Sequence, residues 1–173
     1  QEEWNYRRMT AGIVFLCMNA GFINATTTLS SRSLKVSHVT GSSTNMGLEL
    51  ADADFGDASV RATQIICYLA GAVFCGTVVS SDFYSLKAPY GRLFVSGVAM
   101  LCAALVVHTY HPNSLYYYYI LTAFCGMQSA MGAKIKGSII RTCYMSGCLA
   151  DIGATLGKML RAGKMDRSIG LTS

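Results

Sequence analysis

The sequence predicts an all-α protein, a polytopic membrane helix bundle of about six transmembrane segments with an internal duplication. Only 13% of the 173 residues are charged, about half the proportion in a typical soluble domain. One short motif also occurs twice. We therefore expect a single integral membrane domain over residues 1–173, embedded in a lipid bilayer. Three stretches carry no charge and are long enough for membrane-spanning helices: Met9–Ser31, Ala62–Ser81 and Leu93–Ala133.

The repeated motif indicates the duplication. Lys35-Val-Ser-His-Val-Thr-Gly41 is matched by Arg141-Thr-Cys-Tyr-Met-Ser-Gly147: a basic residue, a ring, an apolar residue, a hydroxyl and a glycine in one order. The segments before each copy match too, Gly21-Phe-Ile-Asn-Ala25 and Gly126-Met-Gln-Ser-Ala130. Many transporter folds are built from such repeats. The duplication divides the chain into a first repeat over about 9–81, a partial second repeat over about 114–160 and a polar tail over 161–173.

The first half of the chain predicts three helices. Met9–Ser30 is an uncharged apolar run. Val36–Ala51 is short and rich in hydroxyls and amides, so it cannot face lipid along its whole length. Asp52–Asp57 is an acidic exposed turn, and the apolar run Val60–Ser81 follows it.

The second half predicts three more helices. Leu93–Thr109 ends before Pro112, because proline cannot continue a helix. Ser114–Ala133 opens with four tyrosines, as is typical of an aromatic belt at a membrane face. Ser138–Leu160 contains the second motif. If every segment spans the membrane, the two copies run in the same direction; if one is re-entrant, they are inverted. The sequence leaves both arrangements open.

Composition excludes several function classes. The net charge of +5 comes from basic residues in short loops beside apolar runs, which anchor helices at the interface, so we expect no nucleic-acid partner. The seven cysteines lie in or beside apolar segments without a C-x-x-C pair, and free cysteine behaves as a small hydrophobe. The phosphate loop, the Rossmann fingerprint and the G-x-S-x-G elbow are absent from the sequence. We expect no metal, no cofactor and no enzymatic activity.

The polar residues of the paired segments are candidates for a solute site. Polar groups are costly in hydrocarbon, so they must face protein or a water-filled cavity. His38 and Asp151 would be the titratable members, and Arg141 would bind an anion or neutralise Asp151. The candidate substrate-binding residues are Asn19, Asn24, His38, Thr40, Gly41, Asn45, Gln128, Arg141, Tyr144, Ser146, Gly147 and Asp151.

A structural interpretation competes with this site. Interhelical hydrogen bonds between such groups stabilise membrane bundles by about 0.6 kcal/mol on average without forming a site. Gly47 and Ala51, like Gly153 and Gly157, form a small-x-x-x-small pattern, which lets helix backbones approach closely. We therefore expect the two short polar helices to meet near the centre of the bundle and these four residues to pack between helices.

These motifs resemble the YoaK family of multi-pass membrane proteins, a domain of unknown function (DUF1275). The resemblance rests on Gly21-Phe-Ile-Asn-Ala25, Val36-Ser-His-Val-Thr-Gly41 and Arg141-Thr-Cys-Tyr-Met-Ser-Gly147 and covers roughly residues 10–160. Ser42 and Ser129 replace amides of the family motifs, and Ser146 replaces a threonine. The resemblance implies further hydrophobic helices after the second motif, so we expect this chain to be truncated relative to the family.

Two functions are compatible with the sequence. The first is a small transporter-like protein with a polar solute site at the repeat interface. The alternative is a non-catalytic accessory subunit of a larger membrane complex, for instance an energy-converting complex of an organelle inner or thylakoid-type membrane. Both imply a multi-pass integral membrane protein whose partners are other membrane subunits or further copies of the chain.

Overall fold

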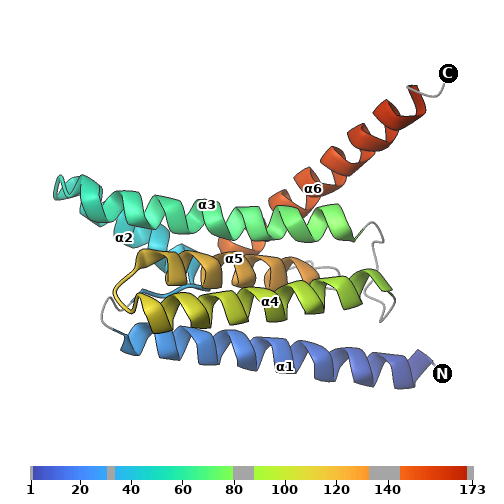
Figure 1. Cartoon of the computed structure of the whole chain (residues 1–173), viewed down its shortest axis with the longest axis horizontal. Coiled ribbons are helices and arrows are strands. Elements are labelled where there is room, and N and C mark those ends of the chain that lie inside the picture. The colour runs from blue at the N-terminus through green and yellow to red at the C-terminus, as the bar shows by residue number, and fades with distance from the viewer. Residues whose placement is uncertain (1, 31–33, 80–87, 133–144, 171–173) are drawn as a thin grey trace.

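A computed structural model of the chain describes residues 2–30, 34–79, 88–132 and 145–170. These residues form six helices and no strand, which confirms the predicted all-α bundle (Figure 1). The helices are α1 (Glu2–Leu29), α2 (Val39–Ala51), α3 (Phe55–Val78), α4 (Ala88–Tyr110), α5 (Leu115–Gly132) and α6 (Met145–Gly170).

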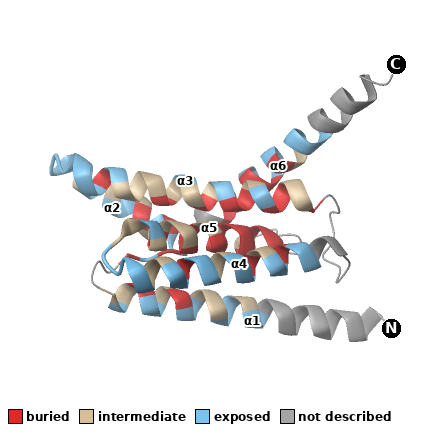
Figure 2. Ribbon diagram, in the orientation of Figure 1, coloured by how far each residue is buried: buried red, intermediate tan, exposed pale blue. Residues whose placement is uncertain are grey.

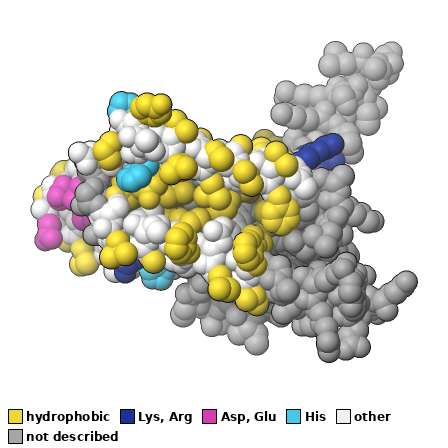
Figure 3. Space-filling view, turned by 60° about the horizontal axis from the view of Figure 1, so that its bottom comes forward, with side chains coloured by type: hydrophobic (Ala, Val, Ile, Leu, Met, Phe, Trp, Pro, Cys, Tyr) yellow, Lys and Arg dark blue, Asp and Glu magenta, His cyan; other side chains and the backbone are white. Residues whose placement is uncertain are grey.

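Two of the described helices are long and apolar enough to cross a membrane. They are α3 and the Gly91–Tyr110 part of α4; the apolar part of α1, Val14–Leu29, is shorter. Large apolar side chains such as Phe15 and Val95 are exposed on the surface of the bundle (Figures 2 and 3). On the face shown in Figure 3, acidic side chains gather at one end of the bundle. A helical bundle with this apolar exterior fits a membrane protein.

Helix α3 is the centre of the packing and contacts α2, α4, α5 and α6. It crosses α5 with the two backbones in direct contact, because each helix carries a glycine at the crossing. A Cβ atom on Gly71 would overlap the carbonyl of Ala123, and one on Gly126 would overlap the carbonyl of Tyr68. The side chains of Tyr68, Cys75 and Cys125 near the crossing are buried.

Helix α6 packs on α3 through a second set of small residues. A Cβ atom on Gly153 would lie 2.6 Å from the Cβ of Ala72, and one on Gly157 would lie 2.8 Å from the Cα of Gly76. The stripe on α6 therefore meets a small-x-x-x-small stripe on α3. Helices α2 and α6 also contact one another, but each packs mainly on α3 rather than on the other.

The short helix α2 determines the relative directions of α1 and α5. Its 13 residues are about 20 Å long, less than the hydrocarbon thickness of about 30 Å, so it does not span. The chain turns back after α1, and α2 then returns to the end of the bundle that α1 has just reached (Figure 1). As a result α1 and α5, which carry the two matched segments, run in opposite directions (Figure 1).

Several predicted helix boundaries differ from those of the structure. The second helix begins at Val39 rather than Val36, because the chain bends at Val36 and Ser37. The third begins at Phe55 rather than Val60, since the Asp54 side chain accepts a hydrogen bond from the Asp57 amide (3.1 Å) and caps it. The last helix ends at Gly170 rather than near Leu160.

The inverted arrangement makes a prediction about labelling from one side of a sealed vesicle. We expect single cysteines at Leu29, Asp54 and Asn113 to react with a membrane-impermeant maleimide from the same side, because all three lie at one end of the bundle (Figure 1). The background should have its native cysteines replaced. If α2 spanned the membrane instead, the cysteine at position 29 would react from the side opposite to the other two.

The α3–α5 crossing predicts opposite effects for two glycine substitutions. Gly71→Ala should destabilise the bundle by about 1–3 kcal/mol, because the added methyl overlaps backbone that cannot move aside. Gly91→Ala is the control: nothing lies within 4 Å of its Cβ position, and alanine favours helix by up to about 1 kcal/mol. Thermal unfolding in detergent measures both. Equal midpoints would contradict the close crossing.

Candidate functional site

Helix α2 begins part-way along the bundle because a short non-helical segment, Leu34–His38, folds back along α1 (Figure 1). In Leu34–His38, apolar and polar residues alternate, so that Leu34 and Val36 are buried while Lys35 is exposed. Ser37 then meets Asn24 of α1 through two hydrogen bonds. The Ser37 amide donates to Asn24 Oδ1 (2.9 Å), and Asn24 Nδ2 donates to the Ser37 hydroxyl.

His38 occupies the residue just before α2 and does not cap the helix with its side chain. The imidazole instead lies over Gly41, where a Cβ atom would come within 2.8 Å of His38 Cδ2. The glycine of the first motif thus leaves room for the histidine of the same motif. His38 is exposed, and with Asn24 and Lys35 it lines an open pocket of about 460 Å³ beside the end of α1.

A second polar cluster joins α1 to α5. Asn19 Nδ2 donates to Gln128 Oε1 (3.5 Å), and Gln128 Nε2 donates to the carbonyl of Leu16. These amides lie beside an apolar pocket of about 150 Å³ between α1, α4 and α5. The cluster links the two helices that carry the matched segments before each motif.

The remaining predicted site residues do not gather at one place. Thr40 and Asn45 lie on the exposed face of α2, and Asp151 lies on the exposed face of α6. Gly147 is buried in the first turn of α6, and Ser146 precedes it in the same helix. Arg141 and Tyr144 lie outside the described residues.

The four predicted packing residues divide into two pairs. Gly153 and Gly157 lie against α3, as described above. Gly47 and Ala51 are exposed, and nothing lies within 4 Å of a Cβ placed on Gly47, so their expected packing between helices is not found within this chain. The physical reason is that α2 presents a different face to α3.

Comparison with known families shows which family the chain belongs to. A family model described as "Protein of unknown function (DUF1275)" matches residues 12–172. The chain belongs to the DUF1275 family. Comparisons with curated proteins and with solved structures gave no match.

Helix α3 of this DUF1275 protein carries a buried glutamine that neither sequence motif includes. Gln64 of α3 is 2% exposed, and neither its amide nitrogen nor its amide oxygen has a partner among the described residues. A buried amide without partners is rare, because leaving it unsatisfied costs about 1–3 kcal/mol. The sequence signal was a glutamine within an otherwise apolar predicted span.

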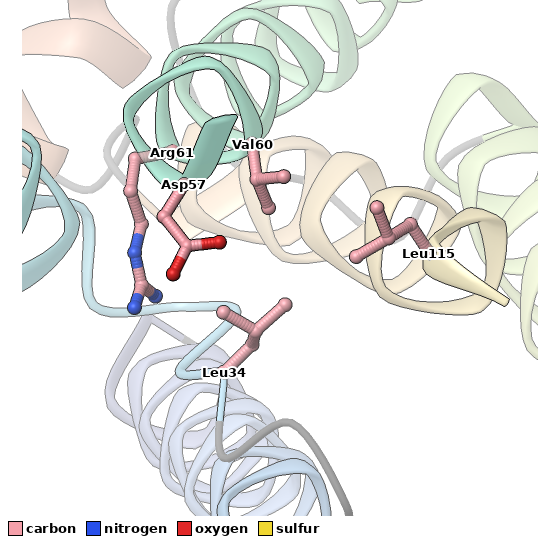
Figure 4. Close-up of a pocket in the computed structure, with 5 residues that line it drawn as sticks. All are labelled: Leu34, Asp57, Val60, Arg61 and Leu115. Carbon is pink, nitrogen blue, oxygen red and sulfur yellow. The ribbon is translucent and has the colours of Figure 1, made fainter. Parts of the chain in front are cut away.

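An ion pair between α2 and α3 was also missed. Arg61 Nε donates to Glu49 Oε1 at 3.0 Å, and both side chains are largely buried. Arg61 and Asp57 extend from α3 toward Leu34, and with Val60 and Leu115 these residues line a pocket of about 220 Å³ (Figure 4). The pocket lies between the start of α3, the start of α5 and the segment that contains Leu34. The charge of Arg61 is already paired with that of Glu49.

The Asn24–Ser37 contact predicts an effect on hydrogen exchange. Asn24→Ala removes both hydrogen bonds, each worth about 1 kcal/mol, so the Ser37 amide should exchange about tenfold faster or more. Hydrogen–deuterium exchange with mass spectrometry measures this. Asn45→Ala, which removes an exposed amide from α2, is the matched control. Unchanged exchange at Ser37 in the first variant would show that Asn24 does not hold the segment.

Proposed function

We propose that this DUF1275 protein is a multi-pass, transporter-like membrane protein that binds a small polar or anionic solute at the start of α2. The observation that carries the proposal is the position of this helix start, which lies within the bundle rather than at its end. Short helices that begin near the midplane at the interface of inverted repeats form the solute sites of many transporters.

The groups around this helix start favour a negatively charged or strongly polar solute. The first backbone N–H groups of an α-helix have no acceptor within the helix, and they carry the positive end of its dipole. Lys35 and His38 line the adjacent pocket, and the Asn24 side chain adds an amide.

The second motif would supply the matching groups of the other repeat. Its Arg141 would bind an anion or neutralise Asp151, and Tyr144 and Ser146 would add ring and hydroxyl contacts. The inverted relation of α1 and α5 supports this proposal, because it brings equivalent segments in from opposite sides.

Transport in sealed vesicles tests the proposal, with formate as the anionic probe and urea as the neutral one. We expect His38→Ala and Asp151→Asn to lower uptake of the transported probe at least tenfold while the protein stays folded. His111→Ala and Asp52→Asn are matched controls, since both residues are exposed in turns away from α2's start. Wild-type rates in both site variants would refute the solute site.

The second candidate is a non-catalytic accessory subunit of a larger membrane complex, in an organelle inner membrane or a thylakoid-type membrane. The observation that favours it is the exposure of small and apolar residues together on α1 and α2, including Gly21, Phe22 and Gly47. Migration of the native chain within an assembly of hundreds of kilodaltons on a native gel would support this role. A purified chain that is monodisperse and transports by itself would contradict it. In both candidate roles the protein is not an enzyme.

A further inference from the structure

The pocket between the starts of α3 and α5 carries two opposite charges that do not pair with one another. Asp57 and Arg61 lie one helical turn apart on α3, a spacing at which an acid and a guanidinium usually meet. Among the described residues, Asp57 makes no ion pair, and Arg61 is paired with Glu49 of α2 instead. Figure 4 shows both side chains extending from α3 toward Leu34, so both charges border the same space of about 220 Å³.

The ion pair with Glu49 leaves most of the Arg61 guanidinium available. A guanidinium carries N–H donors on Nε and on both terminal nitrogens. Arg61 uses Nε, which lies 3.0 Å from Glu49 Oε1, while Glu49 Oε2 is buried without a partner in the part of the chain that the structure describes. The contact is therefore a single hydrogen bond rather than the parallel pair that arginine and a carboxylate often form. The terminal N–H groups of Arg61 are left to bind an acceptor in the pocket.

The charges around this pocket favour a ligand that has both a cationic and an anionic group. Glu49 offsets the charge of Arg61, so the unbalanced charge among the described lining residues is that of Asp57. A carboxylate attracts a cation and accepts hydrogen bonds from it. The terminal N–H groups of a guanidinium donate well to phosphate or carboxylate oxygens. An anion alone would be repelled by Asp57, whereas a zwitterion satisfies both groups.

The pocket lies at the level of phospholipid headgroups. Helix α3 is one of the two described helices long and apolar enough to cross a membrane, and its 24 residues are about 36 Å long, more than the hydrocarbon thickness of about 30 Å. Asp57 lies in its first turn, and the long Arg61 side chain can reach the same level. Leu115 begins α5 and is followed by the exposed Tyr116, a residue type enriched at the membrane interface. The pocket therefore borders the headgroup region of a surrounding bilayer.

We propose that this pocket binds the phosphoethanolamine headgroup of a membrane phospholipid, with its primary ammonium at Asp57 and a phosphate oxygen at the terminal N–H groups of Arg61. A volume of about 220 Å³ corresponds to about seven water molecules, which suits a headgroup of this size. The apolar side chains of Leu34, Val60 and Leu115 line the rest of the pocket and suit the adjoining lipid carbons.

This chemistry distinguishes the ligand from related molecules. A choline headgroup carries the same charges but has no N–H to donate to Asp57, and a glycerol headgroup has no cation at all. Free phosphoethanolamine has the same polar groups but lacks the acyl chains. The site is also separate from the proposed solute site, because it shares no lining residue with the pocket beside Lys35 and His38.

Competition among lipids tests the proposal. The full chain, purified in detergent and depleted of lipid, is offered equal amounts of phosphatidylethanolamine, phosphatidylcholine and phosphatidylglycerol with identical acyl chains, and native mass spectrometry counts the bound lipids. We expect phosphatidylethanolamine to be bound about fivefold more than either competitor, and Asp57→Asn to remove this preference. The variant should fold, because Asp57 is exposed and the cap of α3 uses only its main-chain amide.

Asp52→Asn is the matched control, since Asp52 is an exposed acid at the end of α2 that does not line the pocket, and it should keep the wild-type preference. Equal binding of the three lipids by the wild type, or an unchanged preference in Asp57→Asn, would overturn the proposal. Free phosphoethanolamine at the same concentration should leave the bound lipid in place. Its displacement of the lipid would show that the pocket takes a soluble zwitterion, and would overturn the assignment to a phospholipid.

Discussion

The backbones of α3 and α5 touch at Gly71 and Gly126, and the rest of the bundle is arranged around this contact. In lipid, apolar side chains gain little by turning from the bilayer to one another, so close packing of small residues and hydrogen bonds must hold helices together. Helix α3 packs against α6 in the same way, through the small residues Ala72 and Gly76. Three helices are thus held at short distance by residues with almost no side chain.

The fold-back segment gives the bundle its polar interior. The side chains of Leu34 and Val36 are buried. Ser37 precedes α2, so its amide has no acceptor within a helix and donates to Asn24 Oδ1 instead. This places the first turn of α2 part-way along the bundle, with His38 exposed at the open pocket beside α1. Elsewhere, on α3, the buried amide of Gln64 has no partner among the described residues. The proposed solute site and the inverted repeat therefore have one structural cause.

The two matched segments have similar motifs, but their small residues lie in different surroundings. In the second copy the small residues are used within the chain, against α3. In the first copy the equivalent residues are bare, although nothing in their own sequence distinguishes them from the packed set. A sequence motif of small residues shows that helices can approach there; it does not say which helix does.

The sequence by itself determined that the chain is helical and apolar enough for a membrane, because these properties reside in composition and in local patterns. It also predicted that Gly153 and Gly157 pack between helices, and both lie against α3. Only the tertiary structure decided that the chain folds back along α1 before α2 begins, since that depends on the contact between Asn24 and Ser37, which are 13 residues apart. The same holds for the exposure of Gly47 and the burial of Gln64. Which partner a small or polar face meets is a property of the whole arrangement, and no local pattern contains it.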